Sequence, residues 1–164
     1  MRSLVLIAHN LRSAHNVGSL LRTAEGLGVS QVFLTGYTPY PHQKNDSRLP
    51  HLSQKIDSQI SKTALGAEKT LGEHSESIHE TIKKLKKTGY EIAALEQAPN
   101  SIKLTVFVPP EKLAIVVGRE VDGIEPEILE LCDTILEIPM LGQKESFNVV
   151  QAAAMALYHC RFYI

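Results

Sequence analysis

Residues 113–123 read LAIVVGREVDG, and the first five of them form the most apolar run of the chain. A strand with one solvent-facing side would place a polar residue at every second position, but this run has none. Uninterrupted apolar runs are typical of strands in parallel sheets that helices cover on both faces. A glycine and a polar segment follow, so we expect this strand to open into a loop.

Four other segments read as strands, and helical patterns alternate with them. The expected strands are residues 4–8, 31–36, 90–96 and 134–138. Helical spacing of apolar residues covers 17–27, 60–71, 78–89, 126–132 and the segment from about residue 146. The region 37–58 contains three prolines and is predicted to be irregular. This alternation predicts one α/β domain over residues 1–164, built on a parallel sheet.

Composition narrows the class of protein. The 164 residues suit one domain, and 43% hydrophobic with 21% charged residues is typical of a soluble globular chain. No apolar run is long enough to cross a bilayer, so we expect no membrane partner. Cys132 and Cys160 lie in helical patterns and read as small buried hydrophobes and not as a disulfide, so we expect a reducing, cytoplasmic location. The seven histidines show no metal-ligand spacing, which predicts no metal site. A net charge of −1 argues against a whole-surface nucleic-acid binder and leaves room for a local basic patch.

The segment 16–28, NVGSLLRTAEGLG, contains two polar residues of interest. Asn16 is of a type that caps helices. Arg22 lies off the buried stripe of the expected helix, where it can be an ordinary solvated arginine. Its planar guanidinium can instead bind a phosphate or a carboxylate through two parallel hydrogen bonds.

Two loops follow expected strands and are rich in polar residues. In the first, Gly118 and Gly123 bracket a tight turn, where backbone amides can approach a ligand closely. Glycines are common in such places, so this motif taken alone favours an ordinary turn between a strand and a helix. In the second, Ser146 and Asn148 precede the last helix, either as caps or as groups that face a polar ligand. Ligands of parallel sheets bind beyond the carboxyl ends of the strands, and both loops leave such ends.

Together, the motifs NVGSLLRTAEGLGV, IVVGREVDGIEPEIL and IPMLGQKESFNVVQAAA resemble, in this order, the SpoU/TrmH branch of the SPOUT methyltransferases. The resemblance covers the chain from about residue 4. It implies methylation of RNA ribose 2′-hydroxyls with S-adenosylmethionine as cofactor. It also implies a homodimer and a C-terminal part of the sheet threaded into a deep trefoil knot, an exception to the rule against threading. KTALGAE and GYEIAALEQA resemble the members that methylate a guanosine in the tRNA D-loop.

The resemblance also assigns site residues. Those expected at the cofactor, largely through their backbone, are Leu95, Gly118, Ile138, Met140 and Phe147. Those that match the polar catalytic positions are Asn16, Arg22, Glu120, Ser146 and Asn148. Because arginine keeps its proton, we expect Arg22 to hold the phosphate and ribose, with Asn16 and Glu120 fixing it. The resemblance leaves open the alternative that a deprotonated Arg22 acts as the base. An ion pair between Glu120 and Arg22 is a further expectation.

The departures from the family pattern are small. Phe147 replaces a usual leucine, and Asp122 adds negative charge where RNA must approach. The N-terminal RNA-binding extension of many relatives is not expected in this chain, which leaves the RNA open.

The resemblance leaves more than one function to be weighed. The expected RNA is tRNA, with ribosomal RNA as the second choice. A knotted RNA-binding protein without methyl transfer and an unrelated nucleotide-binding module also stay open. The cationic residues expected to contact phosphates are Arg12, Lys44, Arg48, Lys55 and Lys62.

Overall fold

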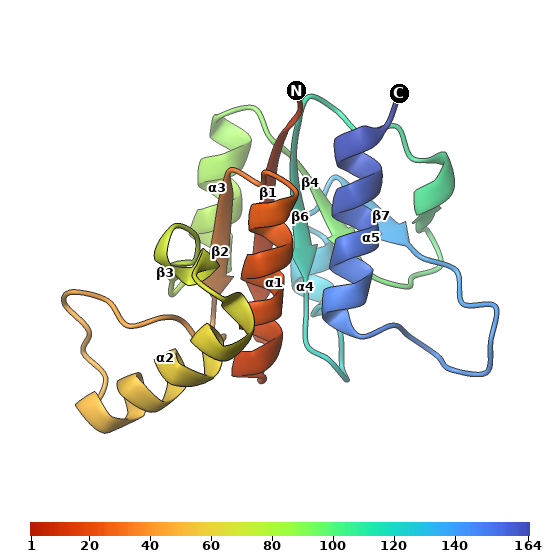
Figure 1. Ribbon diagram of the computed structural model, residues 1–164. Helices are drawn as coiled ribbons and strands as arrows, with labels where there is room; N and C mark the ends of the chain where they lie inside the picture. The colour runs from red at the N-terminus through yellow and green to blue at the C-terminus, as the bar shows by residue number, and fades with distance from the viewer.

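The computed structural model describes all 164 residues, and its centre is a seven-stranded sheet (Figure 1). Every neighbouring pair of strands is parallel, and the order is β3-β2-β1-β6-β4-β7-β5. The strands are β1 (Ser3–His9), β2 (Gln31–Thr35), β3 (Glu73–Ser75), β4 (Glu91–Leu95), β5 (Ile102–Lys103), β6 (Lys112–Val117) and β7 (Thr134–Glu137). The helices are α1 (Ala14–Gly26), α2 (Pro50–Ala64), α3 (Ile78–Lys87), α4 (Pro126–Leu129) and α5 (Val149–Phe162), with short 3₁₀ turns η1 (Ala67–Lys69) and η2 (Leu104–Val106).

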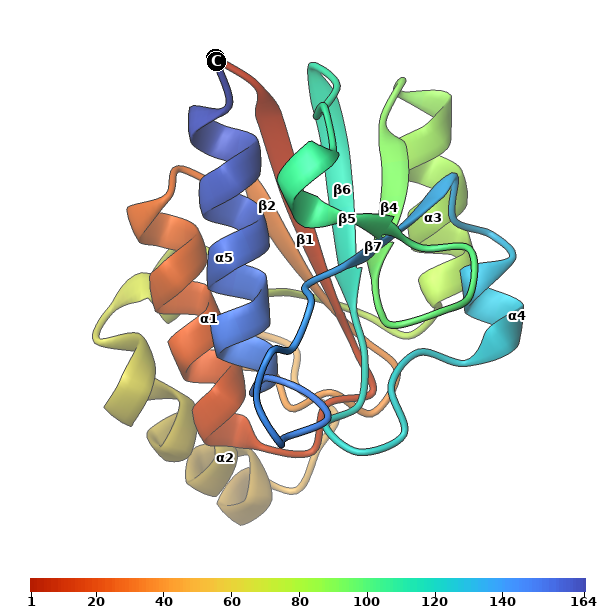
Figure 2. The same ribbon diagram turned by 90° about the vertical axis from the view of Figure 1, so that its right-hand side faces the viewer.

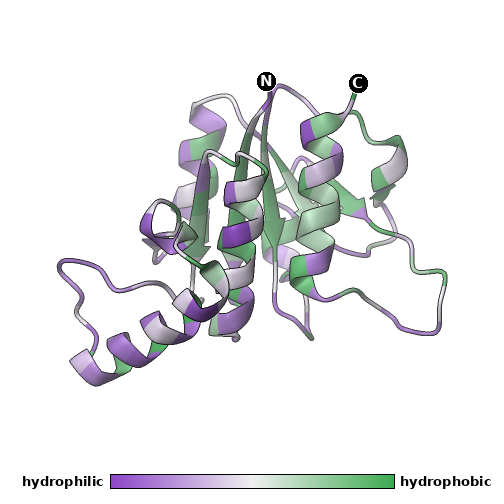
Figure 3. Cartoon of the chain, in the orientation of Figure 1, coloured by the Kyte–Doolittle hydropathy of each residue, from purple (hydrophilic) through white to green (hydrophobic).

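The apolar run of β6 is explained by its central place between β1 and β4. Helices α1, α2 and α5 cover one face of the sheet, and α3 and α4 cover the other (Figure 2). On β1, Leu4 and Leu6 face the first layer of helices, while Val5 and Ile7 face the second. Figure 3 shows hydrophobic residues concentrated on the strands. The predicted fold class, a parallel-sheet α/β domain, is confirmed.

The main error of the sequence prediction concerns α2. The prediction of irregular structure over 37–58 is wrong at its end, because the helix begins at Pro50. Proline is favoured in the first turn of a helix, because the N–H that it lacks would have no partner there. The helix expected over 60–71 is therefore the end of α2, followed by a turn and η1.

Smaller differences concern helix starts and edge strands. Ser13, and not Asn16, caps α1, because its hydroxyl accepts the backbone N–H of Asn16 at 3.2 Å. The last helix begins at Val149, three residues later than expected, with Asn148 as its cap. The edge strands β3 and β5 have three and two residues, too few for a periodic pattern.

The C-terminal strands are interleaved with earlier ones. β6 lies between β1 and β4, and β7 lies between β4 and β5, although both neighbours of β7 precede it in the chain. The loops after β4, β6 and β7 consequently meet at one edge of the sheet. The trefoil knot itself stays a prediction. No helix has both the length and the apolar character that a membrane crossing requires.

Candidate functional site

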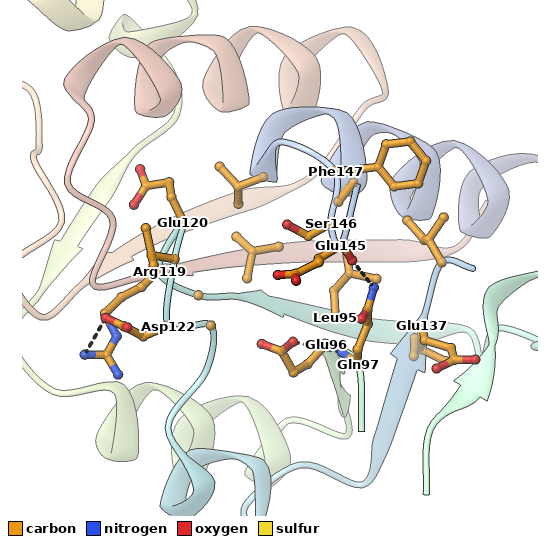
Figure 4. A pocket seen from close by; sticks show the side chains of 18 residues that line it. Leu95, Glu96, Gln97, Arg119, Glu120, Asp122, Glu137, Glu145, Ser146 and Phe147 are labelled. Atoms are coloured by element: carbon orange, nitrogen blue, oxygen red, sulfur yellow. Dashed lines mark hydrogen bonds and ion pairs between the residues drawn. The ribbon is translucent and has the colours of Figure 1, made fainter. Parts of the chain in front are cut away.

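A pocket of about 280 Å³ lies beyond the carboxyl ends of three adjacent strands (Figure 4). Leu95 ends β4, Val117 ends β6, and Leu136 lies near the end of β7. The wall is completed by the loops that follow these strands and by the first turn of α5. Ligands of parallel sheets bind at such edges, so the position agrees with the sequence prediction.

The turn after β6 forms one wall and has a shape that depends on glycine. Arg119 and Gly123 exchange backbone hydrogen bonds, both of 3.1 Å. A Cβ on Gly118 would lie 2.7 Å from the carbonyl of Gly123, so no side chain fits there. Gly123 has φ +69°, a conformation in which other residues are strained. The tight turn between these glycines is as predicted.

Four of the five residues expected at the cofactor line this pocket: Leu95, Gly118, Ile138 and Phe147. Met140, the fifth, is half-buried and does not line it. Phe147 is 37% exposed at the rim (Figure 4). The apolar side chains give the pocket a surface on which a planar base can lie.

Glu120 joins this turn to the start of α1. Its carboxylate accepts the backbone N–H groups of Arg12 and Ser13, each at 3.3 Å, and the side-chain amide of Asn16 at 3.2 Å. Burial raises the pKa of Glu120, but these and other hydrogen bonds outweigh it and leave the pKa below its ordinary value. Asn16 and Glu120 were both expected to fix Arg22, and within the chain they contact each other instead.

Arg22 is not part of this arrangement. It is exposed on α1, makes no ion pair and does not line the pocket. The six residues from Asn16 to Arg22 correspond to about 9 Å of helix rise and roughly 240° of rotation, so the two side chains leave different sides. The expected ion pair between Glu120 and Arg22 is wrong for the single chain.

Ser146 and Asn148 have different positions. Ser146 lines the pocket from the loop before α5. Asn148 lies outside the lining, and its side-chain oxygen accepts the N–H of Val150 at 2.9 Å as the cap of α5. The loop is exposed over 141–148, and the side chain of Gln97 donates to the carbonyl of Glu145 at 2.9 Å. This bond ties the loop to the end of β4.

Asp122 does not present a free negative charge. One of its oxygens lies 3.6 Å from the guanidinium of Arg119, which also lies 3.5 Å from Glu125. Beside them, Nε of Arg119 and one carboxylate oxygen of Glu125 are buried without hydrogen-bond partners. The charge that we expected to oppose RNA is therefore partly balanced within the turn.

Arg48, one of the cations expected to contact phosphates, has a structural role. It forms an ion pair with Asp46, whose side chain is 2% exposed. Its guanidinium carbon lies 3.6 Å from the ring centroid of Tyr40, which in turn stacks on His74. The hydrogen bonds from Arg48 hold the pKa of Asp46 well below its ordinary value. The prediction that Arg48 is available to RNA is wrong, whereas Arg12, Lys44, Lys55 and Lys62 are exposed.

Sequence reasoning missed Glu96 and Gln97, which line the pocket after β4. Their position in the sequence could have indicated them, because they are the first polar residues after a buried strand, at the edge of the sheet where ligands bind. No group of three or more histidine, cysteine, aspartate or glutamate side chains is arranged to hold a metal ion.

Comparisons with known proteins show which family the chain belongs to. The family model described as SpoU rRNA Methylase matches residues 3–158. A tRNA (guanosine(18)-2′-O)-methyltransferase of Aquifex aeolicus is 27% identical over 98% of the chain and 69% of its own length. A 23S rRNA (guanosine-2′-O-)-methyltransferase of Neisseria meningitidis is 32% identical over 96% of the chain, which spans only 58% of that relative.

Solved structures show the same fold. An AdoMet-bound rRNA methyltransferase from Sinorhizobium meliloti has a TM-score of 0.81 at 18% identity, covering 99% of this chain and 57% of its own. The A. aeolicus TrmH/SpoU tRNA modifying enzyme has a TM-score of 0.79 at 23% identity, covering 98% of this chain and 75% of its own.

Proposed function

Because the chain belongs to the SpoU rRNA Methylase family, we propose that it methylates a ribose 2′-hydroxyl in RNA with S-adenosylmethionine as cofactor. The observation that carries the proposal is the meeting of three loops in one pocket beyond β4, β6 and β7. Two of these loops and the start of α1 supply the three sequence motifs. Their spatial meeting is what a cofactor pocket with an adjoining substrate site requires.

The pocket fits the proposed cofactor in its chemistry. Leu95, Ile138 and Phe147 offer apolar surface for an adenine, and the turn at Gly118 leaves room for close backbone contacts. Carboxylates on the wall suit the positive charge of a sulfonium. When bound, S-adenosylmethionine would supply an activated methyl group that a hydroxyl oxygen can accept. The protein then contributes chiefly by holding the ribose in line with that methyl.

Glu120 is better suited to hold the site together than to remove a proton. An effective general base has a pKa near the working pH, whereas hydrogen bonding keeps the pKa of Glu120 below its ordinary value. Its three donors come from the start of α1, so the carboxylate fixes this helix against the turn after β6. Ser146, on the pocket wall, is free to hydrogen-bond the ribose.

Arg22 is proposed to hold the RNA phosphate beside the target ribose. Its exposure and its place outside its own pocket support a role at the pocket of a second copy of the chain. Arginine is suited to this role because its guanidinium stays charged and binds phosphate through paired hydrogen bonds.

A homodimer is proposed because Arg22 lies outside the pocket of its own chain and because α5 has large exposed apolar side chains. Tyr158 and Phe162 of α5 are 60% and 57% exposed. Val106 and Val108 are 69% and 64% exposed. They flank Phe107, whose carbonyl oxygen accepts a hydrogen bond from the ring of His159, so this segment lies against α5. The small and apolar side chains on the other side of α5 add nothing to this surface, because they are buried in the chain's own core: Ala153, Ala156 and Leu157.

Transfer RNA is proposed as the substrate, with a guanosine as the target. The two relatives named above act, by their names, on guanosine, one in tRNA and the other in 23S rRNA. The deciding experiment incubates the purified protein with methyl-labelled S-adenosylmethionine and either a tRNA pool or 23S rRNA. The labelled RNA is then digested and its nucleosides are identified. We expect 2′-O-methylguanosine from tRNA.

Other results would change the proposal in specific ways. Label only in 23S rRNA would move the substrate to ribosomal RNA. Cofactor binding and RNA binding without label in any RNA would favour a binding protein of the same fold. Label on a base would refute ribose methylation.

A further inference from the structure

Glu96, the first residue after β4, holds two parts of the pocket together. One of its carboxylate oxygens accepts the backbone N–H of Gln97 at 2.8 Å. The other accepts the N–H of Ile124 at 3.0 Å. The latter bond reaches the far end of the turn after β6, so one side chain connects the ends of two neighbouring strands.

The position of this carboxylate depends on Gly123. A Cβ on Gly123 would lie 2.1 Å from the Glu96 oxygen that Ile124 binds. The glycine thus leaves the space that the carboxylate occupies. In Figure 4 the side chain of Glu96 extends along the pocket wall toward this turn.

Glu96 keeps unused hydrogen-bonding capacity that faces the pocket. A carboxylate has about four acceptor positions, and the two backbone donors occupy two of them. Four other carboxylates line the pocket: Glu145 lies on the exposed loop before α5, and the other three have partners within the protein. Glu120 has three donors, Asp122 faces Arg119, and Glu137 accepts the hydroxyl of Ser101 at 2.7 Å.

We infer that Glu96 accepts hydrogen bonds from the ribose hydroxyls of the adenosine cofactor. A carboxylate at the end of a parallel strand, beside a glycine turn, is suited to bind the two adjacent hydroxyls of a ribose. The inference rests on the proposed function, because it assumes that an adenosine compound occupies this pocket. Glu96 then selects ligands with an intact ribose diol, while its backbone contacts keep the wall in shape.

The competing role for Glu96 is that it only braces the turn. Removal of the carboxylate would then weaken every ligand of the pocket by a similar factor. The two roles differ in how the loss depends on the ligand, so the test changes the protein and the ligand separately.

The experiment measures binding by calorimetry with S-adenosylhomocysteine and with its 2′,3′-dideoxy counterpart. Both compounds lack the sulfonium charge, so the long-range effect of removing a carboxylate is small. The proteins are wild type, Glu96→Gln, Glu96→Asp and the control Glu91→Gln. Glu91 is an exposed residue at the opposite end of the same strand. Thermal unfolding without ligand shows whether each variant is folded.

Hydrogen bonds to charged groups contribute enough that Glu96→Gln should weaken S-adenosylhomocysteine on the order of tenfold to a hundredfold. The same variant should change the affinity for the dideoxy compound by a much smaller factor. Glu96→Asp should retain part of the preference for the diol, and Glu91→Gln should leave both affinities unchanged. Wild type should bind the dideoxy compound more weakly than the diol.

Equal affinity of wild type for the two compounds would overturn the inference even if Glu96→Gln did not fold. An equal loss for both compounds in Glu96→Gln would also overturn it and leave the bracing role. If wild type bound neither compound, the proposed function would fail as well. Failure of the inference about Glu96 is therefore distinguishable from failure of the proposed function.

Discussion

The side-chain amide of Asn16 donates to the carboxylate of Glu120 across 3.2 Å and joins α1 to the turn after β6. The two residues are far apart in the sequence and belong to different motifs. Two backbone N–H groups at the start of α1 bind the same carboxylate. The carboxylate of Glu120 therefore links two motifs through hydrogen bonds, and it should stabilise the fold only while it is ionised.

The first prediction concerns pH. The pKa of Glu120 in the folded chain lies below its ordinary value of 4.5, so the unfolded chain binds a proton more readily. Its stabilising contribution is thus complete above about pH 5.5 and is lost as the pH falls through the folded pKa. Glu120→Gln should lower stability at neutral pH, and its stability should approach that of wild type at low pH.

Urea unfolding of both proteins between about pH 3 and pH 6 measures this difference. Glu76→Gln is the control, since Glu76 is exposed on the surface. A constant difference in the free energy of unfolding between Glu120→Gln and wild type over the whole pH range would show that the ionised carboxylate does not stabilise the fold.

The second prediction concerns Arg22. Exposed side chains without partners contribute little to folding, so Arg22→Ala should change stability by less than about 0.5 kcal/mol. Cofactor affinity should also be retained, because Arg22 is proposed to bind the RNA phosphate and not the cofactor. Single-turnover methyl transfer to RNA should fall by about a hundredfold or more, as expected for lost charge stabilisation. Arg22→Lys should keep partial activity, since lysine retains the charge without the guanidinium fork.

The control for Arg22 is Lys87→Ala, which removes an exposed cation from α3 on the other side of the sheet. Wild-type transfer rates in Arg22→Ala would remove Arg22 from the site. An ordinary solvated arginine would then be the correct interpretation.

The third prediction concerns RNA affinity. With a net charge of −1, binding has to come from a local group of cations. If three to five phosphates are neutralised, log affinity against log salt should have a slope of roughly −2 to −4. Lys62→Ala should reduce the magnitude of this slope by about one. Arg48→Ala should instead lower stability, because its partner Asp46 is buried.

Filter binding or fluorescence anisotropy over a series of salt concentrations gives these slopes. A wild-type slope near zero would show that phosphate contacts do not supply the affinity. An unchanged slope in Lys62→Ala would place the RNA elsewhere on the surface.

The fourth prediction concerns assembly. Light scattering should give a mass near twice the 18.1 kDa of one chain. A double change, Tyr158→Asp with Phe162→Asp, should give monomers, because it places charges in an exposed apolar surface. Leu65→Asp alters another exposed apolar residue and should leave the dimer intact. A monomeric wild type at micromolar concentration would contradict the proposal.

The sheet and three motifs were predictable because buried strands carry long apolar runs and glycine turns have a visible spacing. The start of α2 was missed because Pro50 reads as a breaker until the first turn of a helix is seen around it. The engagement of Arg48 was missed for another reason. An ion pair within a long loop leaves no periodic pattern, so an arginine that is bound internally looks free.

A site residue could be predicted from the sequence only where it belonged to one of the three motifs. Glu96 follows an ordinary strand, and its contact with Ile124 depends on two strands being neighbours in the sheet. The distance of Arg22 from the pocket likewise follows from helix rotation within one chain, which the motif does not reveal. The contact of Glu96 depends on the order of the strands in the sheet, and the proposed role of Arg22 depends on how two copies of the chain pair.

The most direct test of the central claim is calorimetric titration of the protein with S-adenosylhomocysteine, beside NAD and the Gly118→Val variant. A side chain at Gly118 would collide with the carbonyl of Gly123 and distort the pocket wall. We predict one binding site per chain for S-adenosylhomocysteine, no heat with NAD, and loss of binding in a folded Gly118→Val. No heat with S-adenosylhomocysteine at concentrations well above micromolar would contradict a cofactor pocket beyond β4, β6 and β7.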